Sequence, residues 1–197
     1  MYKLITPPTS EPINAGDAKD HLRITHNLQD IMIDLLIKAA RYQFESDCPA
    51  MQLMPATWGF YLDDWPTFKE RRNADFLIHK YPLSAVSNIK YYAVGEIALT
   101  TWPATNYEVD LLSYPGRIKI IADSFPELNY DKLNNIQVTF TCGFATAALV
   151  PTDIIAGLKL LIGHFYEVSS QVEIGHIVQE TPFGYRQVVA NYTKDWL

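Results

Sequence analysis

The sequence lacks most of the features on which secreted, membrane-bound and metal-dependent proteins rely. It has two cysteines in 197 residues, Cys48 and Cys142, which are too few for a disulfide framework or a cysteine metal site. We expect both to be buried free thiols. No apolar run approaches the roughly 20 residues of a membrane-spanning helix, and the N-terminus has no apolar segment suited to a secretory signal. We therefore expect the protein to stay in the cytoplasm or in a particle assembled there.

A basic excess is also missing. Residues 1–56 hold 5 basic and 7 acidic side chains, residues 57–145 hold 8 and 10, and residues 146–197 hold 3 and 5, so each section carries a charge of −2. Tight binding to nucleic acid depends on basic side chains that displace counterions from phosphates. The composition therefore excludes a chain that holds nucleic acid tightly by itself, but it is compatible with nucleic acid that slides past.

Catalytic and nucleotide-binding motifs are missing as well, since the sequence contains no G-x-S-x-G, no G-x-G-x-x-G and no P-loop. His164, Glu167 and His176 could form a metal set, but they lack the H-E-x-x-H spacing. Asp63 and Asp64 are adjacent, and adjacent residues of a strand point apart. We therefore expect no catalytic residue, no metal and no cofactor. A small hydrolase that uses Asp63, Asp64 or His164 is the enzymatic alternative.

Two long helical patterns dominate what is present. Residues 28–47 and 152–170 each carry apolar side chains on more than one side, which is typical of helices buried on more than one side. In the first helix most apolar residues form one set, and Ile33 and Ile37 lie on another side. In the second helix Ile155, Ile162 and Tyr166 form an extra stripe. Two packed helices cover one stripe each, so the extra stripes need the rest of the chain or another copy of it.

Shorter segments flank these helices. Residues 1–13 contain Pro7, Pro8 and Pro12 and are expected to form an extended arm. Asn14 is a suitable cap for a short helix that follows it, with Asp17 in the capping-box position.

The middle of the chain changes to the period of two that is typical of strands. We expect a mostly antiparallel sheet of five to seven short strands, near residues 58–62, 76–79, 86–93, 97–101, 107–111, 118–122 and 136–142. Residues 94–96 would connect a hairpin, and Tyr114, Pro115, Gly116 and Arg117 would form a turn in the inserted sheet.

The last segment, residues 171–197, has no clear period but holds scattered aromatic residues, so we expect an extended arm that docks on a surface. The predicted fold class is α+β: a small helical core of two main helices and a short N-terminal helix, with an inserted antiparallel β subdomain and an extended C-terminal arm. The expected divisions are 1–56 (N-terminal arm and first helices), 57–145 (β insert), 146–170 (closing helix) and 171–197 (C-terminal arm).

The order of these pieces resembles the head–tail connector, or adaptor, family of tailed bacteriophages and gene transfer agents. The similar stretches run along nearly the whole chain: Leu4–Pro8, Glu11–Ile13, Ala18–Lys19, His21–Ile24, Asp30–Arg41, Pro82–Leu83, Val86, Asn88–Tyr92, Tyr107–Asp110, Pro115–Ile118, Val138–Phe144, Val150–Pro151, Lys159–Glu167 and Pro182–Gly184.

The resemblance implies a structural virion protein of the neck, assembled in the host cytoplasm and without a membrane. Copies would form a homo-oligomeric ring, twelvefold on the portal protein, that extends the channel for double-stranded DNA and docks a stopper or tail-completion protein. Another neck or tail-completion virion protein is the alternative within this class.

The resemblance also implies roles for particular residues. The C-terminal arm would bind the portal through Pro182, Phe183, Gly184, Tyr185, Val188, Val189, Tyr192, Trp196 and Leu197. Contacts within the ring would use the extra helical stripes, Ile33, Ile37, Ile155, Ile162 and Tyr166.

Overall fold

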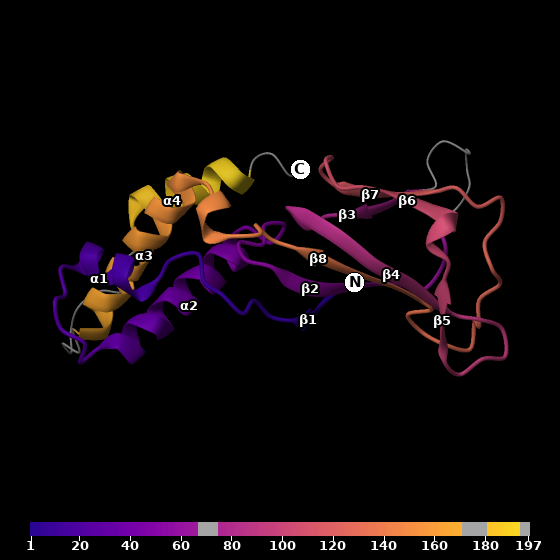
Figure 1. Ribbon diagram of the computed structural model, residues 1–197, viewed down its shortest axis with the longest axis horizontal. Coiled ribbons are helices and arrows are strands. Elements are labelled where there is room, and N and C mark those ends of the chain that lie inside the picture. Colours follow the sequence, from indigo (N-terminus) through magenta and orange to yellow (C-terminus); the bar gives the residue numbers. More distant parts are fainter. Residues whose placement is uncertain (67–74, 171–180, 194–197) are drawn as a thin grey trace. The chain divides into compact units, whose positions relative to one another are not determined.

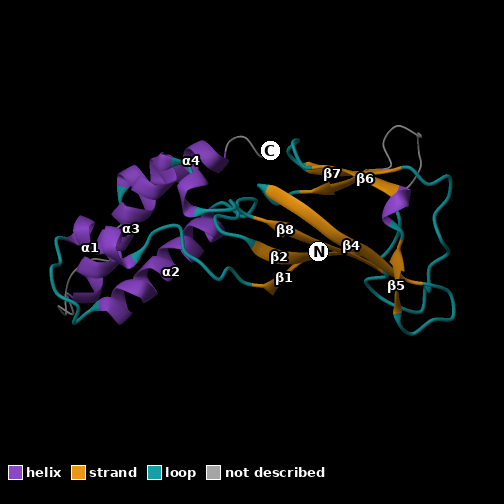
Figure 2. Cartoon of the chain, in the orientation of Figure 1, coloured by secondary structure: helices purple, strands orange, loops and turns teal. Residues whose placement is uncertain are grey.

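The computed structural model describes residues 1–66, 75–170 and 181–193. The chain forms two compact units, each assembled from separate parts of the sequence. The β unit contains Met1–Pro8 and Pro55–Gly143, and the helical unit contains Thr9–Met54 and Phe144–Leu197. All strands belong to the first unit and all four α-helices to the second (Figures 1 and 2). The predicted α+β class is confirmed.

The β unit is built from two antiparallel sheets. The larger has the order β1-β2-β8-β4-β5, with bounds Tyr2–Thr6, Ala56–Leu62, Ile136–Cys142, Leu83–Tyr92 and Leu99–Trp102. The smaller has the order β3-β7-β6, with bounds Asp75–Ile78, Gly116–Ile120 and Tyr107–Asp110. A short 3-10 helix, Ala104–Asn106, precedes β6.

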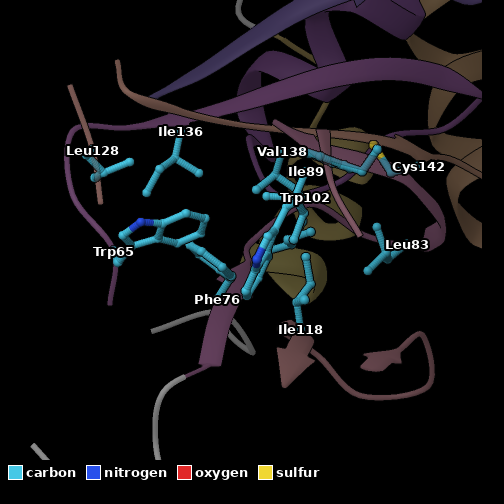
Figure 3. Close-up of a cluster of buried hydrophobic side chains, with 12 residues drawn as sticks. Trp65, Phe76, Leu83, Ile89, Trp102, Ile118, Leu128, Ile136, Val138 and Cys142 are labelled. Atoms are coloured by element: carbon cyan, nitrogen blue, oxygen red, sulfur yellow. The ribbon is translucent and has the colours of Figure 1, made fainter. Parts of the chain in front are cut away.

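Strand β8 forms the centre of the larger sheet because it pairs with β2 on one side and β4 on the other. Its side chains alternate as the sequence predicts: Ile136, Val138, Phe140 and Cys142 are buried, and the residues between them are half-buried. These side chains belong to one buried hydrophobic cluster, which also contains Phe76 and Ile118 of the smaller sheet (Figure 3). A shared core therefore connects the two sheets.

Trp65 packs among the aromatic side chains of this core, and Figure 3 shows it beside Phe76. Its ring stacks on Phe125 with centroids 4.9 Å apart, and it lies 4.9 Å from the ring of Trp102. The indole N–H donates to the carbonyl of Pro126 at 2.9 Å, so burial leaves no unsatisfied donor on this residue.

The N-terminal segment differs from the prediction, since residues 2–6 form edge strand β1 and not an extended arm. Met1 and Tyr61 exchange hydrogen bonds: the terminal amine donates to the Tyr61 carbonyl and the Tyr61 amide donates to that of Met1. The ring of Tyr2 stacks on Phe60 at 4.7 Å. The prolines limit the strand only at its end, because Pro7 follows its last residue.

The predicted insert turn is also shifted. Gly116 and Arg117 belong to β7, and Tyr114–Pro115 is a cis peptide bond, so the chain reverses at residues 111–115. Asp110 organises this turn, since its carboxylate accepts the amide N–H groups of Leu112 and Ser113 and the Nη2 donor of Arg117. The hairpin is therefore closed by the hydrogen bonds that the Asp110 side chain accepts from the backbone, and not by the Pro-Gly pair.

Gly116 has a separate reason for being glycine. A Cβ at this position would lie 2.5 Å from Cδ2 of Leu83, so a larger residue would require the Leu83 side chain to move.

The helical unit contains α1 (Ala15–Leu22), α2 (Asp30–Asp47), α3 (Thr152–Ser170) and α4 (Phe183–Thr193), with a 3-10 turn at Ala147–Leu149. The predicted cap of α1 is confirmed, because Oδ1 of Asn14 accepts the Asp17 amide at 2.8 Å. Helix α3 packs against both α2 and α4. The described part of the C-terminal segment is therefore helical and not extended.

Charged side chains connect the parts of the helical unit. Arg41 on α2 donates through Nε and Nη2 to Glu11 (2.7 and 3.3 Å) and through Nη1 to Glu45 (2.9 Å). Glu45 also accepts from the side chain of Gln52 and the amide of Leu53. Burial raises the pKa of Glu45 above its usual range, although Arg41 lowers it. The network holds the segment before α1 and the segment after α2 onto one helix.

Trp65→Ala tests the aromatic core. We expect the free energy of unfolding to fall by about 3–5 kcal/mol, because the change leaves a large cavity. Urea titration followed by tryptophan fluorescence measures this, since Trp58 and Trp102 remain as reporters in the same unit. Leu112→Ala is the control: Leu112 is 98% exposed, and its loss should cost less than about 0.5 kcal/mol. Equal losses would contradict the assignment of Trp65 to the core.

Arg41→Met tests the charge network. Its side chain is 12% exposed, and that of Glu45 is 14% exposed. We expect a loss of about 2–4 kcal/mol at pH 7, because the change leaves mostly buried carboxylates without their cation. Helix content during urea unfolding measures the loss.

The same variant makes a pH-dependent prediction. A carboxyl group with a raised pKa in the folded state stabilises the fold at low pH and loses that contribution as pH rises. The penalty of Arg41→Met should therefore shrink between pH 7 and pH 5, and Glu45→Gln in that background should recover part of it. A penalty that is constant with pH would contradict this account.

Candidate functional site

Helix α2 has two opposite apolar faces. Its inner face consists of Ile33, Ile37, Ala40 and Phe44, each at most 3% exposed. Phe44 contacts the rings of Tyr185 and Tyr192 of α4 edge-on, with centroids 6.4 Å apart in each case. Ile33 and Ile37, which were predicted as contacts between copies, therefore lie in the core of a single chain. The prediction chose the wrong face of this helix.

The opposite face of α2 is exposed. Four large apolar side chains lie along it and just before it: Leu28 is 91% exposed, Ile31 82%, Leu35 59% and Tyr42 72%. Residues two positions apart in an α-helix point in nearly opposite directions, so Ile31, Leu35 and Tyr42 point away from the inner face. Leu28 lies two residues before the helix begins. We call these four residues the outer stripe of α2.

The predicted second stripe of α3 is mostly covered by the same chain. Ile162 is fully buried, and Ile155 and Tyr166 are half-buried. The hydroxyl of Tyr166 donates to Oε1 of Gln29, just before α2, at 2.7 Å. Tyr166 therefore ties α3 to the start of α2, and Ile162 offers no surface to another copy.

Four of the predicted portal-binding residues attach α4 to the helical unit. Tyr185 is 1% exposed, and its hydroxyl donates to Oδ2 of Asp47 at 2.6 Å. Tyr192 donates to Oδ1 of Asp153 at 2.9 Å, Val188 packs against the backbone of α3 at Gly157, and the Val189 carbonyl accepts from the thiol of Cys48. These side chains form contacts inside the chain.

Burial has a clear effect on the titratable groups of this contact. It raises the pKa of Tyr185 far above its usual value, and the carboxylate of Asp47 adds to the effect. Burial and then Asp47 also raise the pKa of Cys48 to about 11. The Cys48 thiol is therefore neutral at neutral pH and is a poor nucleophile.

The start of α4 forms a second exposed apolar surface. Phe183 is 76% exposed and Leu160 of α3 is 41% exposed. Gly184, the residue after Phe183, lies against Leu160, because a Cβ on Gly184 would be 2.9 Å from Cδ1 of Leu160. We call Leu160 and Phe183 the α3–α4 patch. Of the other predicted arm residues, Pro182 is half-buried, and Trp196 and Leu197 lie outside the described residues.

An open groove lies between α2 and α4, with a volume of about 490 Å³. It is lined by Gln43, Asp47, Thr181, Tyr185, Arg186, Val189, Ala190 and Thr193. The phenol and carboxylate in it already bond to each other, so the groove presents no assembled reactive group.

The β unit carries its own exposed apolar residues on two connected loops. Val94 and Ile97, in the β4–β5 hairpin, are 57% and 83% exposed, and Tyr130 and Leu133, in the loop before β8, are 69% and 82% exposed. Asn129 connects the two loops by hydrogen bonds. Its backbone amide donates to the carbonyl of Tyr92, and its side-chain amide donates to the carbonyl of Glu96. We call the four apolar residues the β-tip patch.

The candidate reactive carboxylates have local structural roles. Asp63 accepts the amide of Asn134 at 2.7 Å, and Asp64 accepts that of Trp65 at 3.2 Å, so both organise loop backbone. His164 belongs to α3 and therefore to the other unit. His176 lies outside the described residues. Within the described ranges, no group of three or more His, Cys, Asp or Glu residues is placed to hold a metal.

Over those same ranges, no helix has the length and apolar character needed to cross a membrane.

The whole fold has counterparts among solved structures. A chain in a structure described as the neck of an empty GTA particle computed with C6 symmetry aligns with a TM-score of 0.74 and 18% identity. A chain in the virion of a native gene transfer agent (GTA) particle aligns at 0.73, and one in the neck of a native GTA particle computed with C12 symmetry at 0.72, both also at 18% identity. Each alignment covers 98% of this chain and 94% of the other.

At this level of identity the likeness establishes a shared fold. No protein-family model matches the chain, and no curated protein matches it.

Tyr185→Phe tests the attachment of α4. The change removes the hydroxyl donor to Asp47 and should lower the free energy of unfolding by about 1.5–3 kcal/mol at pH 7, since the bond involves a charged acceptor. Urea unfolding monitored by the helical circular dichroism signal measures this loss.

The pH dependence gives a second readout. A tyrosine with a raised folded-state pKa stabilises the fold below its unfolded pKa of about 10, and that contribution falls as pH rises further. The parent protein should therefore lose more stability between pH 9 and pH 11 than Tyr185→Phe. Tyr130→Phe, at a 69% exposed position, is the control. Parallel pH profiles for parent and Tyr185→Phe would contradict the role of this hydroxyl.

Proposed function

We propose that this protein is a structural component of the neck of a tailed-phage-like or gene transfer agent particle, and that it acts there as a head–tail adaptor. The observation that carries the proposal is the fold alignment along 98% of the chain with chains of GTA necks and virions. Because the alignment spans both units, it concerns the whole architecture and not one common motif.

The proposed assembly is a homo-oligomeric ring below the portal, twelvefold where it meets the portal. The symmetric necks that contain the similar fold support it, since they were computed with C6 and C12 symmetry. The net charge of −6 also supports a ring through which double-stranded DNA passes, because a wall without a basic excess would not hold the phosphates. No step of this role requires a catalytic residue or a cofactor.

We place the portal contact at the end of the chain, on Trp196 and Leu197. Tyr185, Val188, Val189 and Tyr192, which the resemblance also implied, are occupied in fixing α4 to the helical unit.

The β-tip patch is the surface that we propose for the stopper or tail-completion protein. Its four apolar residues form a group that the two linked loops hold together. Exposed apolar groups of this kind mark interaction sites more often than scattered single residues do.

The decisive experiment mixes the purified chain with purified portal rings of the same particle. Mass photometry and negative-stain electron microscopy should show a ring of this chain on each portal. Removal of residues 194–197 should abolish binding, and the circular dichroism spectrum checks that the truncated chain, which retains α4 (Phe183–Thr193), is folded. Leu112→Ser, at a fully exposed position outside the proposed contacts, should bind normally.

Two outcomes would count against the proposal in different ways. If the full-length chain did not bind the portal, the adaptor role would be wrong, and another position in the neck or tail would have to be tested. If binding survived the removal of residues 194–197, the adaptor role would stand and the location of the portal contact would be wrong.

A further inference from the structure

The outer stripe of α2 and the α3–α4 patch lie on different sides of the helical unit. Helix α3 packs against both α2 and α4 (Figure 2). Phe44, on the inner face of α2, contacts two tyrosine rings of α4. The outer stripe therefore points away from the elements that carry the α3–α4 patch. One helical unit thus exposes two separate apolar surfaces.

Two different surfaces suit a particular kind of assembly. A twofold contact pairs a surface with itself and ends at a dimer, which would leave the other surface exposed. A contact between one surface and the other surface of the next copy repeats around an axis and closes into a ring. Two of the structures that contain this fold are necks computed with C6 and C12 symmetry, and cyclic symmetry is repetition of the second kind.

We infer that the outer stripe of α2 in one copy packs against the α3–α4 patch of the next copy. The inference rests on the proposed function, because it assigns residues to the proposed ring contact. The occupant of the outer stripe is then a second copy of this chain.

The outer face of α2 offers a suitable place for Phe183. Leu35, Lys38, Ala39 and Tyr42 occupy positions i, i+3, i+4 and i+7, and four residues with this spacing surround the hole into which a side chain of a neighbouring helix packs. All four are exposed, and the small Ala39 leaves space between the larger Leu35 and Tyr42. Phe183 is a large, 76% exposed aromatic residue, and aromatic residues often provide the main anchors of interfaces.

Site-directed crosslinking tests the pairing directly. Ala39→Cys and Leu160→Cys, made in separate chains, place one thiol on each proposed surface and keep Phe183 in place. The native thiols Cys48 and Cys142 are buried, so the parent chain should not react with a short bismaleimide. After assembly on portal rings, the equimolar mixture should give a crosslinked dimer. The Ala39→Cys/Leu160→Cys double variant should give a ladder of multimers.

The same gels contain the contradicting outcomes. Dimers of Ala39→Cys with itself, as the main product, would show a twofold contact and overturn the inference. Leu112→Cys, on the β unit, is the matched control; equal crosslinking of Leu112→Cys and Ala39→Cys to Leu160→Cys would also overturn it.

A substitution that fills the proposed hole provides an independent measurement. Ala39→Trp should weaken ring assembly on the portal on the order of tenfold, because it removes the space for Phe183. Its urea midpoint as an isolated chain should not change, since Ala39 is exposed. Leu112→Trp adds the same side chain elsewhere and should assemble normally.

These experiments separate the inference from the function on which it rests. If the parent chain formed no ring on the portal, the proposed function would be wrong. If the parent chain formed the ring, and Ala39→Trp assembled equally well without the expected crosslinks, only the inference would be wrong.

Discussion

The packing of the inner face of α2 is the contact on which the rest of the helical unit depends. Ile33, Ile37, Ala40 and Phe44 are buried, and Phe44 reaches two tyrosines of α4. Complete burial of a large apolar side chain contributes about 1.5–3 kcal/mol. Once this face is in the core, the helical geometry leaves the opposite face, with Ile31, Leu35 and Tyr42, exposed. The same contact thus stabilises the unit and determines which surface it offers to other molecules.

The charge network is arranged around the same helix and limits its rotation. Arg41 and Glu45 lie one turn apart on α2 and connect to Glu11 and Gln52 on either side of it. A rotation of α2 that buried the outer stripe would move Arg41 away from Glu11 and Glu45 away from Gln52. Buried charges that lose their partners are costly, so the network makes the alternative packing unfavourable.

The sequence was sufficient to predict elements whose pattern has one interpretation. Strand β8 alternates clearly, and the three helices at 15–22, 30–47 and 152–170 lie close to where their periodicity places them. The inserted position of most of the β unit followed from its place between the two long helices. These predictions depended on local pattern alone, which is the information that periodicity contains.

The errors share a different physical cause. Both faces of α2 are apolar, so the pattern could not determine which face the core would cover, and Ile33 and Ile37 were assigned to the wrong one. Strand β1 exists because of pairing with β2, more than fifty residues away. Helix α4 had a usable signal, since Tyr185, Val188, Val189 and Tyr192 have helical spacing, but the prolines and glycines nearby obscured it. Long-range contacts decided each of these cases.

The candidate site was less predictable than the fold because its defining property is exposure. Composition indicated surplus apolar surface and the lack of a catalytic set, but exposure depends on what the folded chain covers. Phe183 illustrates this point: it was grouped with Tyr185 as one arm, and the structure shows one side chain 76% exposed and the other 1% exposed. Phe183 is therefore available for contacts with other molecules, whereas Tyr185 attaches the helix to the rest of the unit.

Two exposed apolar surfaces on one unit also bear on how a ring would form. A single contact between two copies must offset the loss of translational and rotational freedom, which costs about 4–15 kcal/mol. A small contact centred on a few side chains, such as Phe183 against Leu35 and Tyr42, is weak by itself. In the proposed assembly, a portal that gathered the copies would raise their effective concentration, so each further contact would form within one assembly. The last contact of a closed ring joins two copies that are already held in place. Modest surfaces are therefore consistent with a chain that remains separate until its platform is present and then assembles cooperatively.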